Sequence, residues 1–349
     1  MNTENLHLFQ KQLKKNGLDG YVITDYVEQL YLTGFHFSPE EAALLITQKE
    51  IYCFTRDLYV LELSNYAPFM HTSSPKDLNF PKAAAAQAKK LKIKKVAFNA
   101  AKTFYLDGKI FEKAKFKPNA FTVGKMREVK TKTELANMRE AGRIIYKTYE
   151  HIKKYLKPGL TESQVAAEVE RYVKTIGATR VSFRTIVAFG VNSNNTHHLP
   201  GDTKLKKEMP VLIDMGALYK DYCSDITRSW WYGSKPTEEY KKVWHIVDKA
   251  RAAGVKNARP GITGKDLDLV PRGVITKAGY GEYFIHRTGH GIGIEVHELP
   301  NVESTNTGKF VQNNVISVEP GVYLPGKFGV RLEDSVVINK TGGIILTDK

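Results

Sequence analysis

The stretch VLIDMGALYKDYCSDITRSWW, residues 211–231, predicts two short apolar strands joined by a polar turn, and each strand carries one aspartate. An even-membered loop centred between Tyr219 and Lys220 would place Asp214 directly opposite Asp225, on one face of the hairpin. Two like charges at that spacing repel each other, so either one carboxyl is protonated or a cation lies between them. The hairpin therefore predicts an acidic site that needs a proton or a cation.

A second stretch, VISVEPGVYLPGKFGVRLEDSVVI at residues 315–338, predicts a similar hairpin near the C-terminus. A three-residue turn over residues 325–327 would pair Glu319 with Glu333. The glycine-rich phrase HRTGHGIGIEVHELP adds an imidazole, His290. Four carboxylates and one imidazole suit two divalent cations, whose positive charges balance the carboxylates. The candidate metal ligands are Asp214, Asp225, His290, Glu319 and Glu333.

The order of these phrases carries a family resemblance. Two aspartates separated by ten residues, followed by GHGIG, VEPG and GVRLED, resemble the metal-ligand series of the pita-bread metallopeptidases, family M24. That family includes methionine aminopeptidase, Xaa-Pro aminopeptidase and prolidase. The resemblance extends from Met126 to Ile338 and implies an α+β protein, in which a pita-bread (creatinase/aminopeptidase) catalytic domain follows a smaller α/β N-terminal domain. The N-terminal domain is typical of the prolidase and Xaa-Pro aminopeptidase branch.

The periodicity of the chain agrees with two domains. Residues 1–124 alternate predicted helices and strands, including a hairpin formed by EAALLIT and IYCFT, and correspond to the creatinase/prolidase-like N-terminal domain. Residues 125–349 correspond to the pita-bread catalytic domain. Capping boxes that begin at Thr131 and Thr161 predict the first two helices of this domain, and a further helix is predicted at 237–257.

The resemblance also implies a role for each ligand. Asp214 would chelate one metal ion, Asp225 and Glu333 would bridge both ions, and His290 with Glu319 would complete the other ion. A hydroxide bridging the two ions would then attack a peptide carbonyl. Glu319 would carry the proton from the water to the leaving nitrogen. Manganese is the family-based expectation for both divalent ions, although Co²⁺, Zn²⁺ and Fe²⁺ also suit such ligands.

Three histidines match positions on the substrate side of the family's site. His297 would donate to the scissile carbonyl or its oxyanion. His197 ends a polar loop, where incidental surface histidines would be the preferred interpretation without the carboxylate series; Thr196 before it stands where the family usually has proline. For His286, a substrate-binding role and a buried structural role are equally favoured. Arg331 shares a strand face with Glu333 and is expected to hold a ligand carboxylate from outside the metal shell.

The substrate is predicted less sharply than the metal site. Several prolidases place an arginine shortly after the histidine that corresponds to His297, where it binds the proline carboxylate of a dipeptide. Asn301 occupies that position here as the expected substrate-binding residue, and a neutral amide holds a carboxylate less firmly than a guanidinium does. This favours an aminopeptidase over a strict dipeptidase, unless another basic residue or a partner subunit binds the carboxylate. The expected function is hydrolysis of the Xaa-Pro bond in dipeptides or short peptides.

Two alternatives come from other classes. A non-catalytic pita-bread protein that binds peptides, the ribosome or other anionic partners would be marked by lost metal ligands, and all five candidates are present. A creatinase-like enzyme would work without the metal set. The formal charge of +15 invites a nucleic-acid partner, but the lysines are scattered in pairs and form no basic stripe with aromatic residues. No nucleic-acid partner is therefore expected.

Composition also bears on the compartment. The 349 residues contain 42% hydrophobic residues, and no apolar run approaches the roughly 18 residues of a transmembrane helix, so no membrane association is expected. Cys53 and Cys223 are the only cysteines, which indicates no disulfide framework. The sequence therefore predicts a cytoplasmic protein, and the family resemblance adds the expectation of a homodimer.

Overall fold

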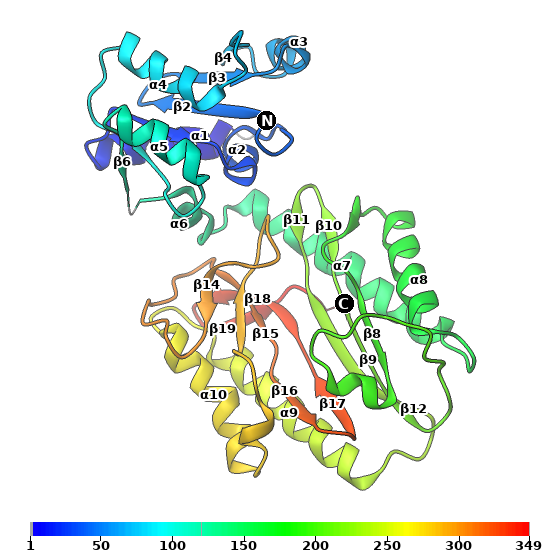
Figure 1. Ribbon diagram of the computed structural model, residues 1–349. Coiled ribbons are helices and arrows are strands. Elements are labelled where there is room, and N and C mark those ends of the chain that lie inside the picture. The colour runs from blue at the N-terminus through cyan, green and yellow to red at the C-terminus, as the bar shows by residue number, and fades with distance from the viewer. Residues whose placement is uncertain (1–2, 120, 349) are drawn as a thin grey trace. The chain divides into compact units, whose positions relative to one another are not determined.

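The computed structural model describes residues 3–119 and 121–348, and the chain divides into two compact units, Met1–Met126 and Arg127–Lys349 (Figure 1). The boundary predicted from the sequence, between residues 124 and 125, falls within helix α6 (Val123–Arg127). Both units combine helices with sheets, as the α+β prediction requires. Among the described residues, no helix has the length and apolar character needed to cross a membrane.

The N-terminal unit is built on one six-stranded sheet with the order β4-β3-β2-β1-β5-β6. The predicted hairpin of EAALLIT and IYCFT is confirmed as β2 and β3, which pair antiparallel from Ala42↔Thr55 to Ile46↔Ile51. Val22, Leu45 and Phe80 belong to a buried cluster that joins the sheet to the helices. The strands are β1 (Gly20–Ile23), β2 (Ala42–Thr47), β3 (Ile51–Thr55), β4 (His71–Ser73), β5 (Val96–Phe98) and β6 (Lys117–Pro118). The helices are α1 (Thr3–Lys15), α2 (Tyr26–Thr33), α3 (Asp57–Tyr66), α4 (Phe80–Lys90) and α5 (Tyr105–Lys113).

Three helices of the second unit begin where the sequence predicts them. Thr131 and Thr161 each accept a hydrogen bond from the backbone N–H three residues on, and both capping boxes are complete. The predicted helix at 237–257 is confirmed, with Thr237 as its N-cap. One further helix contains Pro271 and was not predicted. The helices are α7 (Lys132–Tyr155), α8 (Glu162–Thr175), α9 (Glu238–Asn257) and α10 (Gly264–Lys277), with short 3₁₀ turns η1 (Gly190–Asn194) and η2 (Gly281–Tyr283).

The strands of the second unit form four small sheets, with the orders β11-β10-β7, β12-β9-β8, β14-β13-β15-β18-β19 and β16-β17. Figure 1 shows these strands between the helices α7 and α8 on one side and α9 and α10 on the other. The strands are β7 (Arg180–Val181), β8 (Ile186–Phe189), β9 (Met209–Met215), β10 (Ala217–Tyr219), β11 (Tyr222–Cys223), β12 (Ile226–Tyr232), β13 (Gly289–Gly291), β14 (Glu298–Val302), β15 (Val315–Val318), β16 (Gly321–Leu324), β17 (Phe328–Arg331), β18 (Asp334–Asn339) and β19 (Gly342–Ile345).

The first acidic hairpin forms, but the predicted register is wrong. Asp214 pairs with Thr227, because the turn is centred on Lys220 and Asp221, two residues that both have positive φ angles of 44° and 68°. Asp225 is therefore offset by two residues from the predicted partner. Side chains alternate with a period of two along a strand, so an offset of two keeps Asp214 and Asp225 on the same face. The predicted convergence survives the error in register.

The second hairpin has the predicted register. Leu324 pairs with Phe328 and Gly321 pairs with Arg331, which leaves the predicted three-residue turn at 325–327. Glu319 and Glu333 lie just beyond the paired ends of β16 and β17. Strand β17 contacts both β9 and β12, so the ends of the two hairpins meet in one place. This junction positions the candidate site.

Candidate metal centre

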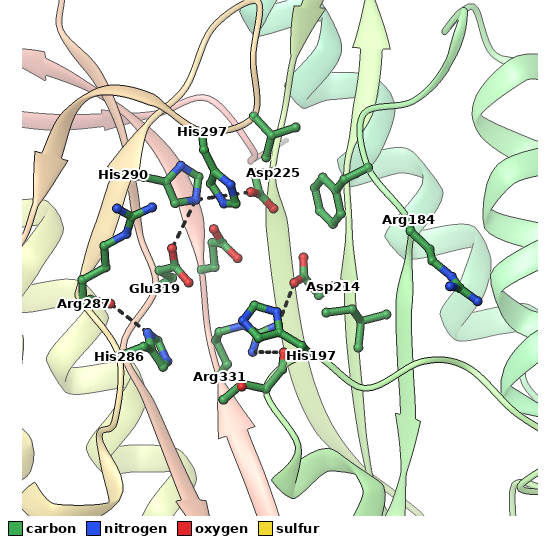
Figure 2. A pocket seen from close by; sticks show the side chains of 15 residues that line it. Arg184, His197, Asp214, Asp225, His286, Arg287, His290, His297, Glu319 and Arg331 are labelled. Carbon is green, nitrogen blue, oxygen red and sulfur yellow. Dashed lines mark hydrogen bonds and ion pairs between the residues drawn. The ribbon is translucent and has the colours of Figure 1, made fainter. Parts of the chain in front are cut away.

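The two hairpins, the loop after β8 and the segment around β13 enclose a cavity of about 510 Å³ within the second unit. Nine of the ten predicted site residues line it: His197, Asp214, Asp225, His286, His290, His297, Glu319, Arg331 and Glu333. The tenth, Asn301, does not line the cavity. Figure 2 shows the side chains of Asp214, Asp225, His290 and Glu319 turned toward a common centre.

Three of the predicted ligands form the tightest group. One side-chain oxygen or nitrogen from each of Asp225, His290 and Glu333 lies within 4.8 Å of the others, and all three residues are buried. His290 Nε2 is 3.8 Å from Asp225 Oδ2 and 3.3 Å from Glu319 Oε1. These separations leave room for a cation between the groups. The group is the one cluster of this kind in the part of the chain that the structure describes.

The backbone around His290 fixes the orientation of its ring. Its Nδ1 lies 3.0 Å from the carbonyl oxygen of Gly291, and a carbonyl can only accept, so Nδ1 carries the proton. Nε2 is therefore the ring nitrogen that faces the carboxylates and is available to a metal ion, as in most histidines that bind metals. A Cβ on Gly289 would lie 2.1 Å from the carbonyl oxygen of Ser317, so glycine is required for this close approach of the strands.

Electrostatics set these carboxyls apart from ordinary ones. Burial raises the pKa of Asp225 and Glu333 well above the usual value, and nearby carboxylates raise both pKa values further. Burial also raises the pKa of Asp214, although Arg331 opposes the shift. For Glu319, burial acts in the same direction, but a hydrogen bond from His290 and nearby positive charges outweigh it and lower the pKa to about 2. The buried carboxyls therefore cannot all ionise together without added positive charge.

The unsatisfied atoms support a cation rather than a proton as the balancing group. Asp214 Oδ1 and Asp225 Oδ1 are buried and have no hydrogen-bond partner. The guanidinium of Arg331 contacts Asp214 Oδ2 at 2.6 Å, so one fixed cation faces four carboxylates. Buried acceptors without partners are rare, and they are expected where an ion binds. The residues present thus fit divalent metal ions.

A network that the sequence did not reveal holds the ligands in place. Thr227 Oγ1 donates to Glu333 Oε2 at 2.6 Å and accepts from Arg331 Nε at 3.1 Å. Arg331 also donates to the hydroxyl of Tyr323 at 3.0 Å. Both missed residues could have been found from alternation, because Thr227 follows Asp225 by two residues and Tyr323 follows Glu319 by four.

Two of the predicted substrate-side histidines, His286 and His297, have different surroundings in the structure. His286 Nδ1 lies 2.8 Å from the carbonyl oxygen of Arg287, and His286 Nε2 lies 2.9 Å from the Tyr323 hydroxyl, so both ring nitrogens are engaged. The ring of His297 packs edge-on against His290, with 4.2 Å between the ring centroids. Burial and then the charges of His290 and Arg287 lower the pKa of His297 to about 4. His297 is therefore neutral at pH 7 and can donate one N–H into the cavity.

Glu162 anchors the loop that carries His197. This buried carboxylate accepts hydrogen bonds from the backbone N–H of Phe189 at 2.8 Å and of Gly201 at 3.1 Å. It also contacts His198 Nε2 at 2.8 Å, which makes His198 a structural residue of the loop. His197 is exposed and lines the cavity instead. Of the two adjacent histidines, the structure brings only the predicted one to the site.

Asn301 lies elsewhere on β14. Its side-chain amide donates to Glu303 Oε1 at 3.1 Å, and the backbone carbonyl oxygen of Asn301 accepts from the side-chain amide of Asn306 at 2.6 Å. Two arginines that the sequence did not single out, Arg184 and Arg287, line the cavity in addition to Arg331. The cavity therefore contains basic side chains, although position 301 holds a neutral asparagine.

Comparison with known proteins agrees with this architecture. Residues 136–340 match metallopeptidase family M24, and residues 6–129 match the creatinase/prolidase N-terminal domain. An uncharacterized peptidase of Staphylococcus saprophyticus subsp. saprophyticus is 42% identical over 226 residues, which cover 65% of this chain and 64% of that protein. A solved Xaa-Pro dipeptidase from Bacillus anthracis is 32% identical with a TM-score of 0.92, covering 100% of this chain and 98% of the other. An X-Pro aminopeptidase from Thermotoga maritima is 33% identical with a TM-score of 0.87, covering 97% and 98%.

Fold and site together define a two-domain protein of the creatinase/prolidase type, with a pita-bread catalytic domain and a buried carboxylate and imidazole centre suited to divalent metal ions. The chain belongs to metallopeptidase family M24, and the protein is a metallopeptidase of that family. The predicted family and fold class are thereby confirmed.

Proposed function

We propose that this metallopeptidase removes the residue that precedes proline from dipeptides or short peptides. The observation that carries the proposal is the convergence of Asp225, His290 and Glu333 within 4.8 Å, beside the unpartnered oxygens of two aspartates. The likeness to a solved Xaa-Pro dipeptidase and a solved X-Pro aminopeptidase, each over nearly the whole chain, supports the proline specificity.

We assign the metal ligands as Asp214, Asp225, His290, Glu319 and Glu333. These residues would hold two divalent ions, which would supply Lewis acidity for the carbonyl and lower the pKa of water. Manganese is our choice for both ions, with cobalt, zinc and iron compatible with the same ligands. Arg331 keeps Asp214 in place through its 2.6 Å contact, and Thr227 does the same for Glu333.

The remaining chemistry is assigned to side chains at the same cavity. Glu319 has a lowered pKa, so it is ionised at neutral pH and can accept a proton and return it to the proline nitrogen. Neutral His297 donates its N–H to the scissile carbonyl oxygen as negative charge develops there. His197, at the exposed side of the cavity, contacts the bound peptide. His286 acts mainly through Tyr323, to which it is bonded, and orients the wall of the substrate site.

The test combines metal analysis with two peptides. Purified protein is dialysed against a chelator, its metal content is measured, and hydrolysis of Ala-Pro and Ala-Pro-Ala is followed before and after Mn²⁺ is restored. We expect both activities to disappear with the metal and to return with it, while Ala-Ala is a poor substrate. Cleavage that persists after complete metal removal would contradict the mechanism. Peptide binding without any hydrolysis by the metal-loaded protein would favour the non-catalytic alternative.

The family-based expectation of a homodimer belongs to the same proposal. Light scattering of the purified protein measures the assembly directly, and a mass of about twice the 39.3 kDa chain is the expected result. A single-chain mass at the concentration used for the activity assay would remove the dimer from the proposal without affecting the metal site.

A further inference from the structure

We infer that Arg287 binds the free carboxylate of the substrate, which makes dipeptides the preferred substrate class of this enzyme. The inference rests on the proposed Xaa-Pro hydrolysis and gives a role to a residue that the ligand series does not include. Its basis is the position of the Arg287 guanidinium at the cavity, the weakness of its contacts within the protein, and the short distance from a dipeptide's carboxylate to its scissile bond.

Arg287 lies at the reactive part of the cavity. It follows His286 directly and lines the same cavity as the metal-ligand candidates. Figure 2 shows its side chain extending alongside His290 and His297. Its positive charge is one of the causes of the lowered pKa of His297, so the two side chains interact electrostatically. A cation therefore lies beside the group proposed to contact the scissile carbonyl.

The geometry of the substrate makes this position selective. In an Xaa-Pro dipeptide, the carboxylate carbon is two bonds from the scissile nitrogen. In a longer peptide, the same carbon belongs to a neutral amide, and the charge lies at least one residue away, about 3.8 Å further along the chain. A guanidinium close to the scissile bond thus gains a charge-assisted, two-pronged contact only with the dipeptide.

Of the three arginines that line the cavity, Arg287 combines a position beside the cluster with a loose hold on its own guanidinium. Arg331 is buried and bonded to Asp214, Thr227 and Tyr323. Arg184 is exposed, and Figure 2 shows it directed away from the carboxylate cluster. The guanidinium of Arg287 forms a loose ion pair with Glu303 Oε2 at 3.8 Å, and both side chains are about one third exposed. That separation exceeds the roughly 2.7–2.9 Å of a charge-assisted hydrogen bond, so an incoming carboxylate can take a better position.

Asn301 acquires a different role in this arrangement. Its amide donates to Glu303 Oε1, while the other oxygen of Glu303 faces Arg287. Asn301 therefore orients the carboxylate that holds Arg287 at the cavity wall in the absence of substrate. The missing arginine at position 301 does not remove the positive charge from the site, because Arg287 supplies it from the neighbouring segment.

The experiment compares Ala-Pro with its C-terminal amide, Ala-Pro-NH₂, in the Mn²⁺-loaded enzyme. We expect the wild type to prefer the acid over the amide by about 10- to 100-fold in kcat/KM, which is the scale of one hydrogen bond to a charged group. Arg287→Met should abolish that preference, chiefly through a higher KM for the acid. Arg287→Lys should keep part of it, since lysine retains the charge but not the planar fork.

Arg184→Met is the matched control, because Arg184 lines the same cavity and points away from the cluster. It should preserve the acid-to-amide ratio. A wild type that hydrolyses acid and amide equally well, or an Arg287→Met enzyme that keeps the ratio, overturns the inference while the proposed function stands. Circular dichroism of each variant checks that the fold is intact.

Failure of the proposed function gives a different result. If the metal-loaded wild type cleaves neither Ala-Pro nor Ala-Pro-NH₂, calorimetric binding of proline and prolinamide replaces the kinetic assay. A preference for proline that disappears in Arg287→Met supports the carboxylate site even without turnover. Equal binding of proline and prolinamide by the wild type overturns it.

Discussion

Glu333 and Asp334 are adjacent in the sequence and equally buried, yet they have opposite surroundings. Asp334 accepts hydrogen bonds from Arg228 at 2.7 Å, from Arg251, and from the hydroxyl of Thr347 at 2.9 Å. Glu333 has one hydrogen bond to its side chain, from Thr227, and the cavity it lines contains the carboxyls of both aspartates of the first hairpin. Because side chains alternate along an extended segment, Glu333 faces a cluster of other carboxyls, while Asp334 faces two arginines.

A second buried acid repeats the paired arrangement. Glu298 contacts Lys130 at 2.7 Å and also Arg127, and all three side chains are almost completely buried. Burial alone would raise the pKa of Glu298, but the two cations lower it below the ordinary value. In contrast, the pKa of Glu333 is raised by burial and by its acidic neighbours. Burial of an acid therefore does not by itself mark a ligand site; the local excess of negative charge does.

The largest effect is expected from Glu333→Gln. Removing one proposed ligand carboxylate should lower kcat/KM for Ala-Pro by about 10³-fold, since metal-assisted charge stabilisation contributes several kcal/mol. The metal-free variant should be at least as stable as the metal-free wild type, because one buried like charge is gone. Activity assays and urea unfolding after chelation measure both quantities. An active Glu333→Gln enzyme with unchanged metal content would remove Glu333 from the site.

Asp334→Asn should give the reverse pattern. Arg228 and Arg251 would lose their shared carboxylate in a buried position, which should lower the free energy of unfolding by about 3–5 kcal/mol. The folded fraction should hydrolyse Ala-Pro at close to the wild-type rate, since Asp334 does not line the cavity. Urea unfolding together with kinetics at a temperature where the variant is folded tests this. Loss of activity without loss of stability would contradict the structural role of Asp334 and its contrast with Glu333.

The contrast between these neighbours was accessible from the sequence because it depends on alternation alone. The same argument explains why the first hairpin was placed on the correct face despite a wrong register. The turn at Lys220 and Asp221 uses two positive φ angles without a glycine or asparagine, so its position gave no clear signal. The error was two residues, which preserves the face, whereas an error of one would have turned Asp225 away from Asp214.

Alternation of side chains along the sequence does not predict contacts between distant segments. The bond between Arg331 and Asp214 joins residues 117 positions apart, and its geometry depends on how two hairpins pack. The place of Asn301 in the phrase HELPNV predicts a substrate-binding role, whereas its amide donates a hydrogen bond to Glu303 two residues further on. Helix α10 was missed because it contains Pro271, which normally argues against a helix.

The smallest predicted effect extends the comparison to a paired acid near the surface. On α8, Glu168 accepts hydrogen bonds from Arg171 at 2.6 and 2.7 Å, and it contacts His151 at 2.6 Å. The bonds from Arg171, opposed by partial burial and aided by His151, lower the pKa of Glu168 to about 2. Arg171 is 58% exposed, so solvent screens the pair, and Glu168→Gln should cost about 1 kcal/mol or less at pH 7.

The pH dependence of that cost follows from the direction of the shift. The pKa of Glu168 is lower in the folded state than in the unfolded chain, where a glutamate titrates near its ordinary value of about 4.3. The stabilisation is therefore present in full above that pH and is lost as the pH falls toward 2. Urea unfolding at a series of pH values between 7 and 3 measures the free energy of unfolding of wild type and Glu168→Gln. The difference between the two proteins should shrink as the pH falls. A difference in the free energy of unfolding that grows at low pH would mean that Glu168 is not stabilised as the anion. The pairing of an acid with cations, seen for Asp334 and Glu298, would then have no counterpart at Glu168.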